Sequence, residues 1–346
     1  MLKRGLSILI ISTLSLYGLC FAKGRSDNWD DIEIDSREAS IKGLEKSELK
    51  KAEKEVLKAP EKLKIFQEAY PDIDFQAEWE EEVKDWKITI TLGERKIILY
   101  WANGAMLPKE ELVNKDLFWS LLYEYDYRKP LKEPDFTKEE IEEIKKFGSD
   151  ENRKSQAGTP MFFFDEIYDS KSRGKLETHI KGISFLGFRV NVHERIVQPL
   201  KEIESKINEA SKTDKEVADF VKSISKNEGY YWRVIANTNR RSFHSLGIAI
   251  DIRPKSYKWK EVYWSWTKDK DPDGWMLTPQ KNRWMPPQAV IDIFEDQGFI
   301  WGGKWIIFDN MHFEYHPELI INASYESEAS SKASEGSSLS GPGTGL

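Results

Sequence analysis

The sequence predicts an α+β fold in which a small antiparallel sheet with flanking helices follows a small α/β accessory region. Two segments with apolar residues three or four positions apart are expected to be helices, residues 194–207 and 215–224. Short β-rich runs follow them at residues 230–236, 247–252, 299–301 and 311–316. The spacing of these runs is typical of hairpins rather than of repeated βαβ units, which favours an antiparallel sheet.

The accessory region is expected over residues 23–155, and it contains no catalytic constellation of its own. A short amphipathic helix over residues 49–57 should end at Pro60. Two alternating runs, residues 86–92 and 96–101, flank a glycine-containing turn and predict a hairpin.

Helix boundaries in both regions carry recognisable signals. Thr137 and Glu140 have the spacing of a capping box that opens a helix over residues 138–146, and Gly148 should end it. Pro287 has the position of an N-terminal proline in a further helix before residue 298.

Composition excludes several classes of protein. At roughly 150 residues per domain, 346 residues are enough for two domains. A hydrophobic content of 39% with 12% aromatic residues is too high for a disordered chain. The 52 basic and 59 acidic residues give a net charge of -7, which offers no overall attraction to a phosphate backbone. We therefore expect no nucleic-acid partner.

The N-terminus predicts export. Residues 1–22 contain Lys3 and Arg4, then an apolar run shorter than the roughly 20 residues that span a bilayer, then Ala22. This is typical of a cleaved signal peptide, so we expect no transmembrane span after cleavage and a periplasmic or cell-envelope location. The alternative is a lipoprotein anchored through Cys20, the only cysteine, although the preceding leucine is larger than such processing prefers.

At the other end, the Ser/Gly-rich residues 321–346 offer little to bury, and we expect a disordered tail. Residues 156–320 remain as the domain in which chemistry is expected.

Histidines and carboxylates gather in two short segments of that domain. In a strand after Gly247, Asp251 shares a face with a small residue, and the glycine lets His244 turn toward that face. In the second segment, alternation places His312, Glu314 and His316 together. Two histidines and one aspartate can then meet across adjacent strands. Such donors suit zinc, and three protein ligands leave a fourth position for water, as in catalytic sites.

The paired motifs S-x-H-x-x-G-x-A-x-D, from Ser242 to Asp251, and D-x-x-H-x-E, from Asp309 to Glu314, resemble those of the D-alanyl-D-alanine carboxypeptidase (VanY-like) zinc peptidases. That family includes L-alanyl-D-glutamate endopeptidases. The resemblance covers about residues 179–318 and implies a hedgehog/D-Ala-D-Ala-peptidase-like fold.

The resemblance also implies site residues. His244, Asp251 and His312 would be ligands of one catalytic Zn²⁺, and Asp309 would be the general base that takes a proton from the attacking water. Arg233 matches the arginine that such peptidases place upstream of the first motif, and it would stabilise the oxyanion. Arg241 is the alternative candidate for this role.

The implied substrate is a peptidoglycan stem peptide, cut by a hydrolase of the bacterial cell wall. Many carboxypeptidases of the group have Glu where Asp309 stands, whereas Asp there is more like the endopeptidases. The scissile bond therefore stays open. We expect a monomer.

Other residues have two readings each. His316 is expected to be structural or to support a ligand, and Glu314 either orients a ligand or the substrate amine or is a salt-bridged surface group. Ser242 is expected to form a turn. His179 and His193 are expected at the surface or in packing. Five tryptophans between the two motifs form either a wall over the substrate or ordinary packing: Trp259, Trp264, Trp266, Trp275 and Trp284.

Two functional alternatives remain. One is a catalytically silent zinc domain that binds wall peptide or a protein, as the hedgehog domains suggest; it would retain metal without turnover. The other is that the accessory region is the functional part, as an envelope-binding adaptor.

Overall fold

The computed structural model describes residues 59–236 and 238–338, with residues 328–338 described by their backbone alone. The predicted signal peptide (1–22), the predicted helix 49–57 and the last eight residues of the predicted tail lie outside the described residues. The described residues fall within one compact unit, residues 58–346. None of the helices in this described part has the length and apolar character that crossing a bilayer requires.

Three antiparallel sheets account for the strands. The accessory sheet has the order β1-β2-β3, a separate hairpin pairs β4 with β5, and the largest sheet has the order β6-β7-β9-β8. The strands are β1 (Asp74–Glu80), β2 (Asp85–Leu92), β3 (Arg95–Tyr100), β4 (Ile180–Phe185), β5 (Phe188–His193), β6 (Ile224–Glu228), β7 (Ala249–Pro254), β8 (Phe299–Trp301) and β9 (His312–Tyr315).

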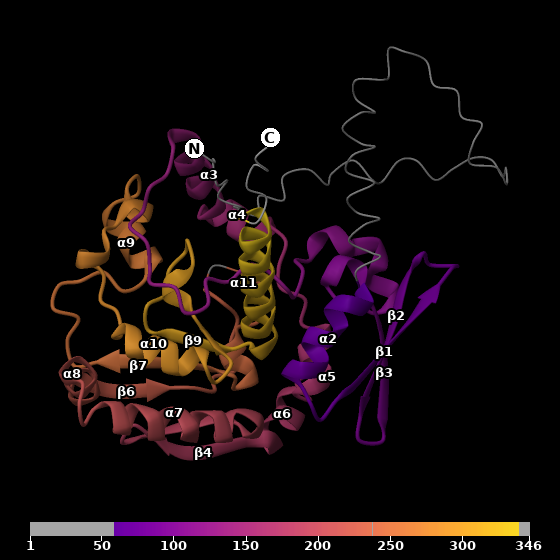
Figure 1. The fold of residues 1–346 in the computed structure, drawn as a ribbon, viewed down its shortest axis with the longest axis horizontal. Helices are drawn as coiled ribbons and strands as arrows, with labels where there is room; N and C mark the ends of the chain where they lie inside the picture. The colour runs from indigo at the N-terminus through magenta and orange to yellow at the C-terminus, as the bar shows by residue number, and fades with distance from the viewer. Residues whose placement is uncertain (1–58, 237, 339–346) are drawn as a thin grey trace, which may run out of the picture. The chain divides into compact units, whose positions relative to one another are not determined.

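Helices of various lengths surround these sheets (Figure 1). They are α2 (Ala59–Ala69), α3 (Lys138–Phe147), α4 (Asp150–Ser155), α5 (Phe162–Ile167), α6 (Arg173–His179), α7 (Val197–Ala210), α8 (Lys215–Ser223), α9 (Trp264–Lys270), α10 (Gln288–Glu295) and α11 (Pro317–Ser338). Short 3-10 turns connect them, and η4 (Phe243–Leu246) is the one that the site uses. The α+β fold class predicted from the sequence is confirmed.

Elements that depend only on residues close together in the sequence form where the sequence predicts them. The hairpin β2–β3 closes between Leu92 and Arg95, with Gly93 in the left-handed region at φ 59°. The capping box of α3 is present in both directions, because Thr137 accepts from the Glu140 backbone and Glu140 accepts from the Thr137 backbone. The end of α3 at Gly148 is also as predicted.

Other elements differ from the prediction. Residues 230–236 do not form the predicted strand, because their backbone bonds go to separate segments instead of along one strand. The Tyr230 amide donates to the Asn191 carbonyl of β5, the Tyr231 amide donates to the His244 carbonyl of η4, and Val234 forms an isolated bridge with Arg241. The sequence predicts no strand at β1, β4, β5 or β6. Pro60 is the second residue of α2, a position that a proline tolerates near a helix start; the predicted end of the helix 49–57 lies outside the described residues.

The tail expected from residue 321 is helical as far as Ser338, because α11 continues through it. The start of α11 is held by burial of Leu319, Ile320 and Ala323, and Tyr325 bonds to Glu68 at 3.0 Å. Buried anchors in the first turns thus extend order into a segment whose composition alone indicates a flexible chain.

One hydrophobic core crosses the predicted boundary at residue 155. Phe66 of α2 contacts Phe163 of α5 with ring centroids 5.3 Å apart, and both side chains are fully buried. The same cluster includes Ile88 of β2 and Phe313 of β9. Figure 1 shows α11 beside α2, and the two helices are in contact. The described part of the accessory region therefore packs as part of the domain that follows.

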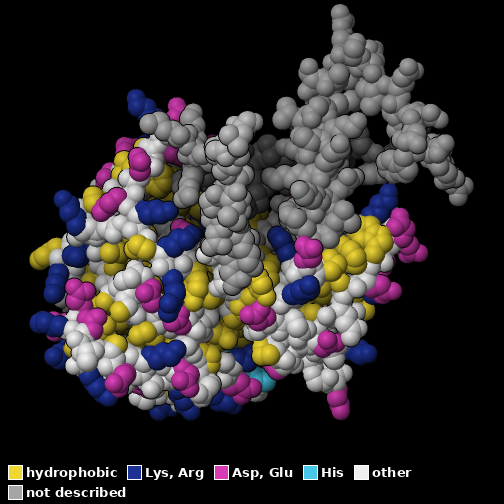
Figure 2. Space-filling view, in the orientation of Figure 1, with side chains coloured by type: hydrophobic (Ala, Val, Ile, Leu, Met, Phe, Trp, Pro, Cys, Tyr) yellow, Lys and Arg dark blue, Asp and Glu magenta, His cyan; other side chains and the backbone are white. Residues whose placement is uncertain are grey.

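The surface mixes charges of both signs. Over the face drawn in Figure 2, acidic and basic side chains are interspersed. Hydrophobic side chains gather on the right of this view, over the accessory sheet. Within that sheet, Trp79 and Ile98 lie on opposite faces and are 39% and 54% exposed.

Candidate metal centre

His244 is held by a buried turn. All four residues of η4 are buried, and the Ser242 hydroxyl caps the turn by accepting from the His244 backbone N–H at 3.3 Å. Ser242 is thus the turn former that its position predicted. The His244 Nδ1 lies 2.7 Å from the Gly229 carbonyl oxygen. A carbonyl can only accept, so Nδ1 carries the proton and Nε2 is left with a lone pair.

Asp251 and His312 lie opposite each other on the two central strands of the largest sheet. The register of β7 and β9 pairs Asp251 with His312, and it pairs Ile250 with Phe313 on the other side of the pleat. Ile250 and Phe313 are fully buried in the core. Alternation therefore directs the two polar side chains away from the core and toward each other.

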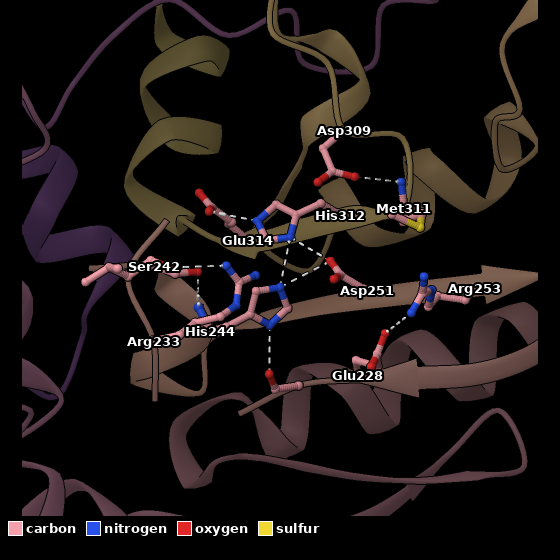
Figure 3. A network of polar contacts seen from close by, with 12 residues as sticks. Glu228, Arg233, Ser242, His244, Asp251, Arg253, Asp309, Met311, His312 and Glu314 are labelled. Atoms are coloured by element: carbon pink, nitrogen blue, oxygen red, sulfur yellow. Dashed lines mark hydrogen bonds and ion pairs between the residues drawn. The ribbon is translucent and has the colours of Figure 1, made fainter. Parts of the chain in front are cut away.

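Three donor atoms converge at this point (Figure 3). His312 Nδ1 lies 2.7 Å from Asp251 Oδ1, and His244 Nε2 lies 3.2 Å from each of them. His312 Nε2 bonds to Glu314 Oε1 at 2.8 Å, so its proton donates there. The lone pairs of three atoms would otherwise face one another, and a positive species, either a proton or a metal ion, has to lie among them.

The charges of the cluster are strongly interdependent. Burial alone would raise the pKa of Asp251, but His244 and His312 hold it well below its usual range. Burial alone would lower the pKa of His312, but the carboxylates of Asp251 and Glu314 raise it well above its ordinary value. Without a metal, therefore, His312 carries the positive charge of the cluster.

The donor set fits zinc. Zinc bonds of about 2.0–2.1 Å to nitrogen or oxygen place tetrahedral donor atoms roughly 3.3 Å apart, close to the separations found here. Each imidazole is oriented by a bond from its other nitrogen, His244 to Gly229 and His312 to Glu314. Ligand histidines are typically fixed by such bonds.

Glu314 and His316 are both buried, and both have hydrogen-bond or ion-pair partners. Glu314 lies between His312 and His316, and the bonds from these two imidazoles lower its pKa to about 2 against the opposing effect of burial. His316 is buried and bonds on to Glu318 at 2.8 Å. Glu314 therefore holds the His312 ring directly, and His316 holds Glu314 from the side away from the donor atoms.

Asp309 lies in the loop before β9. The backbone of Asp309 pairs with Tyr263, and its amide donates to the Gly302 carbonyl at 3.0 Å. Burial and the nearby charge of Asp251 raise the pKa of Asp309 to about 7. Figure 3 shows its carboxylate beside His312. A carboxyl group with this pKa, within reach of the charges of all three donors, suits proton transfer near neutral pH.

The two arginine candidates differ in their surroundings. Arg241 bonds to the Asp165 carboxylate and, at 2.7 Å, to the Ser170 carbonyl, so its guanidinium is committed to holding a loop. Arg233 is exposed, and the one hydrogen bond described for its side chain goes to the neighbouring Val234 carbonyl. Burial raises the pKa of Tyr263, the residue that pairs with Asp309, and the positive charge of Arg233 slightly opposes that rise. The Arg233 side chain is therefore available at this end of the site.

The tryptophan-rich insertion mainly packs. Trp264 and Trp275 are buried in a cluster with Phe308, directly before Asp309. Trp266 and Trp259 are exposed, by 45% and 103%. The loop that carries Asp309 is also held by Arg283, whose guanidinium donates to the buried Asn310 side chain at 2.6 Å.

Gly247 ends η4 at a place where a side chain does not fit. Its φ is +72°, and a Cβ would lie 2.7 Å from Ile180 Cδ1 and 2.8 Å from the His193 backbone nitrogen. We expect Gly247→Ala to cost on the order of 2 kcal/mol or more of folding free energy and to weaken metal binding by displacing His244.

Gly187→Ala is the matched control for this change. Gly187 also has a positive φ, +82°, but a Cβ there would meet nothing within 4 Å. Denaturant unfolding and zinc titration of both variants separate backbone strain from displacement of the site. Equal zinc affinities would show that the close contacts at Gly247 do not matter to the cluster.

Sequence reasoning missed Glu318 and Tyr70, which extend the network behind His316. Glu318 lies in the first turn of α11, beyond the strand that ends at Tyr315, so the alternation of His312, Glu314 and His316 does not extend to it. Tyr70 is 248 residues away from Glu318 in the chain, and no local pattern connects them.

Comparisons with known proteins bear on the segment that carries the cluster. Residues 62–122 match a domain of unknown function (DUF8518). No curated protein and no solved structure matches the chain. Residues 236–315, which contain His244, Asp251, Asp309 and His312, match the family model of D-alanyl-D-alanine carboxypeptidase, so the segment that holds the three donor atoms is similar to a peptidase.

Proposed function

We propose that this chain is an exported zinc metallopeptidase that hydrolyses peptide bonds involving D-amino acids in peptidoglycan stem peptides. The observation that carries the proposal is the convergence of His244 Nε2, Asp251 Oδ1 and His312 Nδ1 within 3.2 Å, in a segment that matches a D-alanyl-D-alanine carboxypeptidase. Residues 1–22, with their signal-peptide pattern, are the basis for export.

In this proposal, His244, Asp251 and His312 hold one zinc ion. When bound, zinc lowers the pKa of water toward about 7 and polarises an amide carbonyl. Asp309 accepts the proton of the attacking water and later gives it to the departing amine, a role that its raised pKa of about 7 supports. Arg233, with a guanidinium not committed to a carboxylate among the described residues, stabilises the oxyanion or the substrate carboxylate.

The protein's own groups also fix the geometry of the reaction. Glu314 and the Gly229 carbonyl hold the two imidazoles so that both present a lone pair to the same point. Pairing with Tyr263 fixes the backbone that carries Asp309. These supports are in place before any substrate binds, and such preorganisation lowers the cost of reaching the transition state.

Incubation of the zinc-loaded protein with a defined stem pentapeptide tests the proposal and identifies the bond. A product shortened by one terminal D-alanine is expected of a carboxypeptidase, whereas release of the first L-alanine is expected of an L-Ala-D-Glu endopeptidase. Mass spectrometry of the products distinguishes them. Zinc retention without cleavage of this peptide or of muropeptides would contradict the proposal and favour a silent binding domain.

A further inference from the structure

A chain of polar contacts leads from the metal-binding cluster to the accessory region. His312 Nε2 bonds to Glu314 at 2.8 Å, and the other Glu314 oxygen lies 3.3 Å from His316 Nε2. His316 Nδ1 bonds to Glu318 at 2.8 Å, and the second oxygen of Glu318 accepts from the Tyr70 hydroxyl at 2.7 Å. Every step uses a different atom of the intervening residue, so the chain is continuous.

The chain is shielded from water. Glu318 is 0% exposed, Tyr70 3%, His316 4% and Glu314 9%. A buried carboxylate cannot replace a lost partner with solvent, and hydrogen bonds in such surroundings depend on one another. Removal of one member is therefore expected to affect the orientation of the next.

His316 has little freedom to rearrange. Its ring makes edge-to-face contacts with Phe243 and Phe164, with centroids 4.6 Å and 5.5 Å apart. Phe243 precedes His244 in η4, so the same packing adjoins the other end of the cluster. The imidazole transmits the position of Glu318 to Glu314 because it cannot turn to other partners.

The far end of the chain belongs to the accessory region. Tyr70 directly follows α2 and lies in the segment that matches the domain of unknown function. Glu318 is in the first turn of α11, the helix that packs on α2. A second contact runs in parallel, because Trp305 packs against the buried cluster that contains the accessory residue Tyr125, and its ring centroid lies 5.7 Å from that of His312.

We propose that Tyr70 is a positioning residue for the metal centre, through which the accessory region sets the affinity of the cluster for zinc. This inference rests on the zinc site of the proposed function. The Tyr70 hydroxyl fixes Glu318, Glu318 and Glu314 hold His316 between them, and Glu314 fixes the Nε2 of His312. The accessory region is in this way a part of the site rather than a separate adaptor.

The test is the zinc affinity of the full chain with Tyr70→Phe, measured by competition with a chromophoric chelator. Loss of a direct partner of a metal ligand typically weakens metal binding about 10- to 100-fold, and for this more distant partner we expect about 5- to 10-fold. The absorption spectrum of the cobalt-loaded variant is a second readout, and its ligand-field bands are expected to shift.

Tyr125→Phe is the matched control. The Tyr125 hydroxyl also comes from the accessory region and donates to a fully buried carboxylate, that of Glu295, at 2.6 Å. Glu295 bonds to Lys304 and has no described bond to His312. The control should lose stability but keep its zinc affinity to within about twofold, since no partner of a ligand is lost.

Unchanged zinc affinity in Tyr70→Phe, or equal weakening in both variants, would overturn the inference while the zinc site itself stands. Failure of the unmodified protein to bind zinc would overturn the site and the inference together. If Tyr70→Phe does not fold, Glu318→Gln, which weakens the same chain one step closer to the cluster, is judged by the same criterion against Tyr125→Phe.

Discussion

If the chain hydrolyses stem peptides as proposed, replacement of Asp309 by asparagine is expected to lower kcat by about 10²- to 10⁴-fold, the usual contribution of a general base. Asparagine keeps the size of the side chain and can still accept the Met311 amide, which bonds to Asp309 Oδ1 at 3.4 Å. It cannot take a proton from water. Because Asp309 is outside the set of three donor atoms, we expect zinc affinity to be nearly unchanged.

Steady-state kinetics and metal analysis of the same preparations check this result. Asp296→Asn serves as the control, since Asp296 pairs with Arg128 at the surface and should leave kcat as it is. Undiminished turnover in Asp309→Asn would remove Asp309 from the mechanism. Loss of zinc together with turnover would assign it to metal binding instead.

Zinc addition to chelator-treated protein is expected to raise the free energy of unfolding by about 4 kcal/mol when free zinc is about 1,000 times Kd. The cause is binding to a site that exists only in the folded chain. At pH 7 the binding should release a proton, because the raised pKa of His312 leaves it protonated in the metal-free cluster and zinc requires its Nδ1 lone pair.

Thermal unfolding with and without zinc measures the stabilisation, and calorimetry in two buffers of different ionisation enthalpy measures the proton. His312→Gln should abolish both effects. His179→Gln should retain them, because His179 bonds to Glu194, away from the cluster. A similar response of the two variants would mean that zinc binds elsewhere.

The part of the site that the sequence could predict is the part written in local alternation. Asp251 and His312 share a side of the sheet because in each strand they alternate with apolar residues that face the core. That pattern is visible in the sequence alone. The turn at Gly247 and the cap at Ser242 are local for the same reason.

Nonlocal contacts decided the rest. Residues 230–236 have β-forming side chains, but their backbone bonds go to three different segments instead of along one strand, and Tyr231 and Val234 remain 67% and 51% exposed. The β4–β5 hairpin turns at Leu186 and Gly187, both of which have positive φ. The glycine of this turn is visible in the sequence, but a second glycine within β4 interrupts the alternating pattern of the strand. The order of α11 depends on its burial against other elements, which composition does not contain.

The shared core limits how short a fragment of this chain can be and still keep the metal-binding cluster packed. A fragment with only residues 236–315 would carry the three donor atoms but would leave behind Glu318, Tyr70 and the aromatic rings of α5 that close the core. Such a fragment would contain the three donor atoms without the residues that pack around them. A fragment that keeps this core and its polar contacts therefore has to include the sequence from α2 to α11.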